Sequence, residues 1–382
     1  MTQKYTNLLA GLCEQSFRYM EFSPRVQTIA RNIENARKQG RQVATSISWR
    51  DGGLSQDEAY EVAAAGCALR MLGSRKSLPI GRKIGFTNKS IWADHNIDAP
   101  NWGYVYADTI LPPGPSAAIR RNFMMKPTEW GLQPHIAPEL VLSMRSAPSS
   151  SMSDAELAGC VAWFALGLEI VHSVYPDLRF TAPETTAAGA LHCYLFTGTN
   201  LRVRTDRALD GLAQGLTNLE VGLNCNGIQV ESGSTRNVLG SPLNALRHLC
   251  AILEVQSLHP RIQPGEIITT GTMTKVKPIS PGETWTVGAS MRDTGLGDHL
   301  EPRFFLPLTV KFTSQDFLET HKDQALIVPK ILESPGQLSE SSVRKIHVPP
   351  VRKLGPLRMR ESLPPATTRT FFKLTLAKDP DI

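Results

Sequence analysis

The sequence predicts an α+β protein in which a helical N-terminal region precedes a strand-rich body and a tail rich in Pro and Ser. Helical patterns of apolar residues continue to about residue 72. From Ile80 onward the chain breaks into short β-like runs separated by Gly, Pro, Asn and Asp. Beyond about residue 320 no periodicity is sustained. We therefore expect three parts, with the bounds 1–72, 73–318 and 319–382.

Composition limits the classes of function. The 382 residues are 41% hydrophobic and 20% charged, as in an ordinary globular protein, with a formal net charge of +6. The segment Val343–Ile382 has nine Lys and Arg against three Asp and Glu, so it accounts for all of this charge. The rest of the chain is close to neutral, and we expect no nucleic-acid partner. We expect the tail to be disordered, either without a role or as an arm that meets a partner.

The cysteines and the apolar runs indicate the compartment. Six cysteines are widely spaced and form no C-x-x-C pair, which favours neither a zinc site nor a disulfide framework. The first residues lack the long apolar stretch of a signal peptide. The longest apolar run, CVAWFALGL, is far shorter than the roughly 20 residues that span a bilayer. We therefore expect a cytoplasmic protein without a membrane partner.

Local signals place the elements in order. Ser55 and Glu58 have the spacing of a capping box before the helical run EAYEVAAAGCALRML, and Ser153 and Glu156 repeat this spacing. The segment SPLNALRHLCAIL predicts an amphipathic helix. PGEIITTGTMTKVKPISPGETWTV alternates strand-like runs with Pro-Gly turns, and LTVKF, ending at Phe312, predicts the closing strand.

Two predicted strands carry a carboxylate at an unexpected place. In QPHIAPELVLSM, period two puts Glu139 on one face with His135 and Ala137, while apolar residues occupy the other face. In FALGLEIVHSV, Glu169 shares a face with Gly167. Both glutamates could lie on solvated faces. If instead both are buried, a cation must meet them, because an unpaired buried carboxylate costs several kcal/mol.

Common catalytic motifs are absent from the sequence. It contains no G-x-S-x-G, P-loop, H-E-x-x-H or strand-linked G-x-G-x-x-G. These absences weigh against serine hydrolases, kinases and dinucleotide enzymes, and they return attention to the carboxylates.

Five segments together resemble one family. GRKIGFTNKSIWADHNIDAPNWGYVYAD, QPHIAPELVL, GLEIVHS, VLGSPLNAL and PGEIITTGTMT…ISPGETWTV occur in the order seen in 2-hydroxypenta-2,4-dienoate hydratases. The related 4-oxalocrotonate decarboxylases share the pattern, and both belong to the fumarylacetoacetate hydrolase superfamily. The resemblance covers about Leu54 to Phe312. It implies a mixed β-roll core, a homo-oligomer, and a lyase acting on a small 2-oxo or 2-hydroxy acid.

The resemblance also implies a set of site residues. It implies Mg²⁺ or Mn²⁺ held by three carboxylates, two from an E-x-E strand and one from a G-[LI]-E-[IV] strand. Glu139 matches the second Glu of E-x-E, and Glu169 matches the third ligand. Lys83 in GRKIG matches the active-site lysine, with Gly81 and Gly85 allowing close approach on either side. Without the resemblance, Lys83 would be interpreted as an exposed strand lysine.

The sequence departs from the family pattern at three places. Ala137 replaces the first Glu of E-x-E, Asn101 replaces an acidic residue, and Glu184 stands near the aspartate of an A-D-N-A-S segment. Losing a carboxylate should weaken metal binding. A water or substrate oxygen could fill the place, His135 could lean in from one pleat repeat away, or the site could have been repurposed or lost.

The resulting prediction is a hydratase, with a decarboxylase as the alternative. A metal ion would stabilise an enolate, and Lys83 would hold the substrate carboxylate and steer protons. Asn101 could orient a water but could not act as a base. The motifs are also compatible with a weakly active binding protein whose tail meets a partner, and with an enzyme acting on a larger biosynthetic intermediate.

Overall fold

The computed structural model describes residues 2–18, 20–43, 53–74, 77–95, 97–112, 119–291 and 294–313. Grouping by contacts separates Met1–Ile327 from Val328–Ile382. The predicted tail, 319–382, lies outside the described residues, and the boundaries at 72 and 318 stay predictions. None of the helices in the described ranges combines the length and apolar character needed to cross a bilayer.

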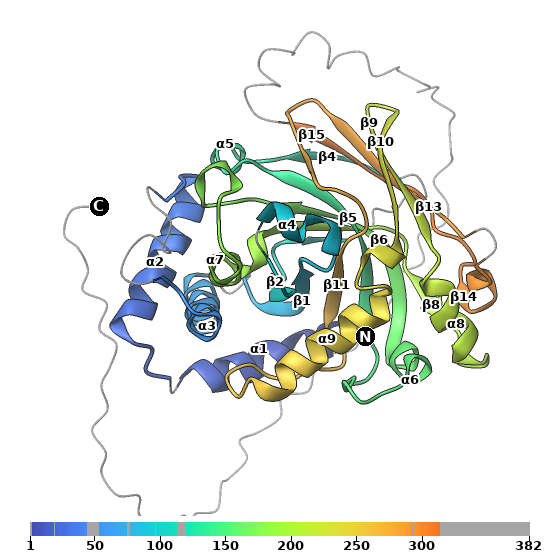
Figure 1. Ribbon diagram of the computed structural model, residues 1–382, viewed down its shortest axis with the longest axis horizontal. Helices are drawn as coiled ribbons and strands as arrows, with labels where there is room; N and C mark the ends of the chain where they lie inside the picture. The colour runs from blue at the N-terminus through green and yellow to red at the C-terminus, as the bar shows by residue number, and fades with distance from the viewer. Residues whose placement is uncertain are drawn as a thin grey trace, which may run out of the picture. The chain divides into compact units, whose positions relative to one another are not determined.

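Three helices form the N-terminal region, as the sequence predicts: α1 (Thr2–Arg18), α2 (Pro24–Gln39) and α3 (Gln56–Gly73). The Ser55 hydroxyl accepts a hydrogen bond from the Glu58 backbone N–H and caps α3. The second half of the predicted capping box differs, because the Glu58 carboxylate pairs with Arg25 of α2 at 2.7 Å. Figure 1 shows α2 and α3 beside one another and α7 (Ala182–Ala187) next to α3.

The remaining helices are short, except for the predicted amphipathic helix, α9. They are α4 (Trp92–His95), α5 (Pro127–Trp130), α6 (Asp154–Gly159), α8 (Leu209–Leu216) and α9 (Pro242–Val255), with 3-10 turns η2 (Lys89–Ile91), η3 (Pro176–Leu178), η4 (Gly189–Leu191), η5 (Thr235–Asn237) and η6 (Leu296–Asp298). Ser153 and Glu156 form the predicted capping box of α6. Thr181 and Glu184 form another at α7.

The larger of two sheets has ten strands, and its main path runs β14-β8-β6-β5-β11-β1-β2. Its strands are β1 (Pro79–Gly85), β2 (Asn101–Tyr106), β3 (Ile110–Leu111), β5 (His135–Met144), β6 (Val161–Val171), β7 (His192–Thr197), β8 (Leu201–Val203), β11 (Ile267–Thr272), β12 (Lys277–Pro278) and β14 (Leu300–Glu301). Most neighbours are antiparallel, but β1 pairs with β11 in parallel. This mixed arrangement confirms the α+β prediction.

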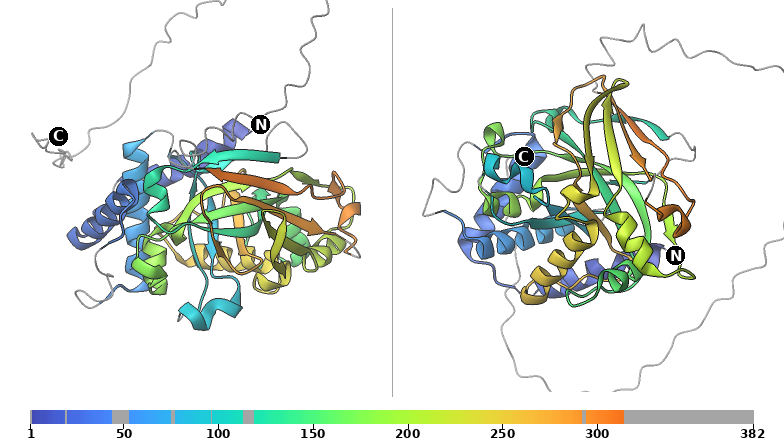
Figure 2. Two further views of the ribbon diagram at one scale, coloured as in Figure 1. Left: turned by 90° about the horizontal axis from the view of Figure 1, so that it is seen from above. Right: turned by 45° about the vertical axis from the view of Figure 1, so that its right-hand side comes forward.

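The smaller sheet has five strands in the order β10-β9-β13-β15-β4. They are β4 (Ile119–Met124), β9 (Glu220–Cys225), β10 (Ile228–Ser234), β13 (Thr284–Ser290) and β15 (Leu308–Thr313). The predicted closing strand is β15, which lies between β13 and β4. Figure 2 shows the two sheets from two further sides.

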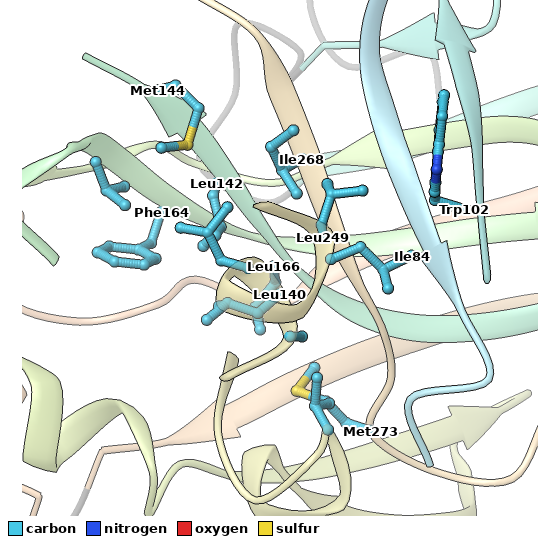
Figure 3. Packing of buried hydrophobic residues seen from close by; sticks show 14 of the residues in the cluster. Ile84, Trp102, Leu140, Leu142, Met144, Phe164, Leu166, Leu249, Ile268 and Met273 are labelled. Atoms are coloured by element: carbon cyan, nitrogen blue, oxygen red, sulfur yellow. The ribbon is translucent and has the colours of Figure 1, made fainter. Parts of the chain in front are cut away.

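The main hydrophobic core lies against one face of the large sheet. Leu140 and Leu142 of β5, Leu166 of β6 and Ile268 of β11 point toward Leu249 of α9, as Figure 3 shows. Each of these side chains is buried. Because successive strand residues point to opposite faces, this packing assigns the odd-numbered residues of β5 and β6 to the other face. That face carries the two glutamates.

Candidate active site

Five neighbouring strands of the large sheet each place one polar group at the same face. In sheet order they carry Asn101 (β2), Lys83 (β1), Gly271 (β11), Glu139 (β5) and Glu169 (β6). Glu139 and Glu169 are 1% and 0% exposed. The solvated interpretation of the two glutamates is therefore wrong, and so is the exposed interpretation of Lys83, which is 6% exposed.

Lys83 provides the cation that the buried carboxylates require. Its Nζ lies 2.6 Å from Glu169 Oε2, although β11 and β5 separate the two strands. Flat strands spaced about 4.8 Å apart would put β1 and β6 about 14 Å apart, too far for these side chains to meet easily. Figure 1 shows that the sheet is curled. Because the two side chains meet across two intervening strands, they project from the concave, inner face of this curl.

A backbone N–H at a break in the pairing of β11 with β5 holds Glu139. The register between β11 and β5 shifts between Thr269 and Thr272, and within this bulge the Gly271 N–H donates to Glu139 Oε2 at 2.9 Å. Gly271 has φ +99°, a conformation that favours glycine. Burial, followed by the Glu169 carboxylate, raises the pKa of Glu139 well above its ordinary value, so this group binds a proton readily.

Glu169 has a second hydrogen-bond partner, His192 at the start of β7. Its Oε1 lies 2.8 Å from Nδ1, while Nε2 of the same ring lies 2.8 Å from Thr109 Oγ1. Burial, followed by the Lys83 charge, lowers the pKa of His192 well below its ordinary value. The neutral ring carries one N–H and one acceptor nitrogen, so it hydrogen-bonds Glu169 through one nitrogen and Thr109 through the other. The histidine therefore orients the carboxylate.

Ala137, the position at which the resemblance implies a metal-ligating glutamate, lies directly opposite Glu169. Ala137 is opposite Glu169 in the register of β5 and β6, and it is 2% exposed. The His135 ring donates from Nδ1 to the Gln133 carbonyl oxygen at 2.8 Å. Among the residues that the structure describes, no three His, Cys, Asp or Glu side chains are grouped as a metal-binding set. The two carboxylates are the oxygen donors that a hard divalent ion prefers, but they are one ligand short.

Asn101 lies on the same face as Lys83. It pairs with Gly85 across β1 and β2, while Lys83 pairs with Gly103. The Asn101 side-chain nitrogen donates to the hydroxyls of Thr185 and Thr186 in α7. Helix α7 therefore anchors this residue.

Two residues near the predicted site serve the fold. The Glu184 carboxylate accepts from the Thr181 backbone N–H at 2.7 Å and caps α7. Gly81 lies so close to β11 that an added Cβ would be 1.9 Å from the Ile267 carbonyl oxygen.

Four residues at this site were not expected from the sequence: His192, Thr109, Thr185 and Thr186. His192 belongs to no short motif, and its contact depends on the shift in register between Ile170 and Val171 at the β6–β7 pair. The two threonines stand within APETTAAG, but the sequence directs attention there to Glu184. The adjacent threonines were the signal that could have been used, since α7 presents both hydroxyls to Asn101.

The fold is a curled mixed sheet, and the site on its inner face consists of two buried carboxylates and a buried lysine. This combination of fold and site is what the comparison with protein families tests. Residues 87–301 match the model of the fumarylacetoacetate (FAA) hydrolase C-terminal family. The chain belongs to this family, which confirms the resemblance seen in the sequence.

Curated relatives carry the two names that the motifs indicated. A 4-oxalocrotonate decarboxylase of Pseudomonas sp is 23% identical over 258 residues, which cover 68% of this chain and 91% of the relative. The 2-keto-4-pentenoate hydratase 2 of Dechloromonas aromatica (strain RCB) is 26% identical over 244 residues, which cover 64% and 84%.

A solved structure has the same fold. The 4-oxalocrotonate decarboxylase from Pseudomonas putida G7, complexed with magnesium and adipate, matches with a TM-score of 0.62 at 21% identity. The match covers 77% of this chain and 99% of that chain. It supports the predicted superfamily architecture around the site.

Proposed function

We propose that the protein is a lyase that hydrates a small conjugated 2-hydroxy or 2-oxo acid by way of an enolate. The observation that carries this proposal is the buried ion pair between Lys83 and Glu169, 2.6 Å apart, beside the buried Glu139. An enzyme that stabilises an enolate needs positive charge where the oxygen becomes negative. The relatives named as 2-keto-4-pentenoate hydratases support the same class of substrate.

Glu139 and Glu169 would hold a divalent ion, Mg²⁺ or Mn²⁺, which supplies Lewis-acid stabilisation of the enolate oxygen when it is bound. In the structure these carboxylates contact the Gly271 N–H, Lys83 and His192, so they would hold the ion in place of some of these contacts. Because Ala137 supplies no oxygen, we expect this chain to bind the ion weakly.

Lys83 would bind the substrate carboxylate and move protons at the carbon skeleton. Its ammonium group already lies against Glu169, so a substrate carboxylate that approaches the pair gains a hydrogen-bond donor within a closed, low-dielectric site. Asn101 would orient a water but cannot take its proton at neutral pH.

The alternative in the same class is decarboxylation of a 4-oxalocrotonate-type acid. The decarboxylase relative and the fold of the P. putida enzyme favour it. The missing ligand at Ala137 favours a third candidate, a reaction on a larger biosynthetic intermediate without a tightly held metal. A small-molecule 2-oxo or 2-hydroxy acid is the partner for the hydratase and the decarboxylase, and we retain the predictions of a homo-oligomer and a cytoplasmic location.

The first experiment follows the ultraviolet absorbance of 2-hydroxypenta-2,4-dienoate with the purified protein, with added Mg²⁺ or Mn²⁺ and again with chelator. The proposal expects loss of conjugation that depends on the metal and yields the hydrated product. A flat absorbance under both conditions contradicts it. Carbon dioxide release from 4-oxalocrotonate, without hydration, would select the decarboxylase.

Ala137→Glu tests the metal ligands separately from activity. The variant restores a third carboxylate opposite Glu169, so its affinity for Mn²⁺, measured by titration calorimetry, should rise above that of the wild type. Val141→Glu is the matched control, since this residue lies on the same face of β5 but beyond Glu139, within a small apolar cluster. An equal effect of both variants would count against Glu139 and Glu169 as ligands.

A further inference from the structure

The side-chain oxygen of Asn101, Oδ1, is buried and receives no hydrogen bond from the residues that the structure describes. The residue is 2% exposed, and its Oδ1 is buried and lacks a partner among the described residues. A Cβ added to Gly85 would lie 2.4 Å from this oxygen, so the oxygen occupies the place that a side chain at Gly85 would take. A buried acceptor without a donor costs free energy, and such an atom in a site calls for a ligand that donates.

The hydroxyl groups around Asn101 fix which end of the amide faces them. Thr185 Oγ1 and Thr186 Oγ1 both donate their protons to the Ala182 carbonyl oxygen, at 2.8 Å and 3.1 Å. A hydroxyl has a single proton, so both oxygens can then only accept. The Asn101 nitrogen meets this demand, since it donates to Thr185 at 2.7 Å and to Thr186 at 3.0 Å.

If the amide were flipped, the Asn101 oxygen would face the two threonine oxygens, and no proton would be available for a hydrogen bond between them. Gln56, which donates to Thr186 Oγ1 at 2.8 Å, adds a further donor at the same hydroxyl. The amide is therefore held with its oxygen toward the face that carries Lys83.

We propose that Asn101 Oδ1 accepts a hydrogen bond from a hydroxyl group, namely the water that adds to the substrate, and that Thr185 and Thr186 are the positioning residues that fix this acceptor. This inference rests on the proposed function and deepens it, because it assigns a water site and so favours hydration over decarboxylation. A neutral acceptor suits a neutral donor, whereas the cation of this site already has its carboxylate.

The reaction that this water enters balances with one water molecule. Its oxygen forms a bond to the carbon β to the 2-oxo group, and the π electrons of the double bond move toward the carbonyl oxygen. Lys83 gives one proton to the carbon next to the carbonyl, and the proton that the water loses returns to Lys83, so that no proton is gained or lost overall. Asn101 holds the water by one O–H and leaves its lone pair for the new bond, without taking the proton.

The test separates water addition from enolate formation. Hydration of 2-hydroxypenta-2,4-dienoate reports both, whereas exchange of the C3 protons of 2-oxopentanoate in D₂O, followed by NMR, needs the enolate but no added water. Asn101→Leu should slow hydration by about tenfold or more, the size of a hydrogen bond lost from a transition state, and leave exchange within about twofold. Thr185→Val combined with Thr186→Val frees the amide and should lower kcat for hydration in the same direction.

Thr28→Val is the matched control. The Thr28 hydroxyl also donates to the carbonyl oxygen four residues before it, that of Pro24 at 2.8 Å, but it lies on an exposed part of α2. This variant should change neither readout. Should Asn101→Leu fail to fold, judged by circular dichroism, the double threonine variant carries the test alone.

Three results would overturn the inference. Unchanged hydration in the folded variants removes the water site, and an equal fall of hydration and exchange gives Asn101 a structural role. A wild type that releases carbon dioxide but adds no water also rejects it. A wild type that neither hydrates the dienoate nor exchanges the C3 protons instead rejects the proposed function itself.

Discussion

Arg82 and Lys83 are neighbours on β1, yet they belong to opposite faces of the sheet and to different kinds of buried ion pair. The Arg82 Nη1 atom lies 2.6 Å from Glu266 Oε2, and its Nη2 donates to the Pro260 carbonyl oxygen. The guanidinium carbon also lies 5.4 Å from the centre of the Trp102 ring. Lys83 and Glu169 form a pair of the same length that faces the inside of the curled sheet.

The two pairs differ in what surrounds them. Glu266 completes its contacts with the Gln263 backbone N–H at 2.7 Å, and the pair lies against aromatic rings of the core. Glu169 instead has a second carboxylate, Glu139, and an alanine as neighbours. A pair closed by aromatic rings and the backbone stabilises the fold, while a pair beside a second proton-binding group has the parts for chemistry.

The largest effect should come from Lys83→Met, which removes the cation of the inner pair. We expect hydration to slow by about 10²–10⁴-fold, because the group that binds the acid and moves protons is lost. The free energy of unfolding should change less than after loss of Arg82, since Arg82 also donates to the backbone and packs on the Trp102 ring. The ultraviolet assay and urea unfolding measure the two effects. Activity within tenfold of the wild type would contradict the role of Lys83.

Arg82→Met should reverse the pattern. It leaves Glu266 buried without its cation and should lower the free energy of unfolding by about 3–5 kcal/mol. The protein that remains folded should keep its kcat. Urea unfolding provides the measurement, and Arg204→Met is the control, because the exposed pair of Arg204 with Asp206 should contribute nothing measurable. A small loss of stability in Arg82→Met would contradict the comparison.

His192→Phe sharpens the comparison within the inner face. It removes the hydrogen-bond partner of Glu169 Oε1 and should reduce activity or Mn²⁺ affinity by about 10–100-fold, as is typical for partners of metal ligands. His192→Asn keeps an N–H near the place of Nδ1 and should recover part of the loss. If the two variants lose equally, orientation of Glu169 is not what the histidine supplies.

The smallest effect concerns a third buried pair, between α2 and α3. Glu34 accepts from Arg37 at 2.6 Å and from Arg70 at 3.0 Å. Burial alone would raise the pKa of Glu34, but Arg70 and Arg37 outweigh it and leave the pKa below the ordinary 4.5. The folded state therefore binds fewer protons than the unfolded state, so this stabilisation is complete above 4.5 and is lost as the pH falls through the folded pKa.

Glu34→Gln tests the direction in which the stabilisation by Glu34 changes with pH. Its free energy of unfolding should fall short of the wild type at neutral pH, and the difference should shrink as the pH falls below 4.5. Urea unfolding at a series of pH values provides the measurement. Glu61→Gln, at an exposed position of α3, is the control for general acid effects. A gap that widens in acid would contradict the assignment.

The sequence predicts the strands of this site well because their signal is local. Alternation in β5 and β6 assigns Glu139 and Glu169 to one face, and the family motifs add Lys83 and Asn101. The roles of these four residues stay predictions, although the structure brings them to one face.

Contacts that depend on register or on distant partners could not be predicted. His192 reaches Glu169 only because the pairing of β6 and β7 shifts. The Ser55 capping box fails in part because Arg25, 33 residues before Glu58, competes for the carboxylate. A local sequence pattern does not show which residue from a distant part of the chain will contact a given side chain.

The bulge at Gly271 has a consequence for how the site comes into being. The N–H that holds Glu139 arrives 132 residues later in the chain, and the threonines that hold Asn101 arrive 84 residues after it. Such contacts raise the contact order and slow folding, since long loops must close before they form. During synthesis, the helices α1 to α3 can form early, but the chemistry must wait until residue 271 has left the ribosome.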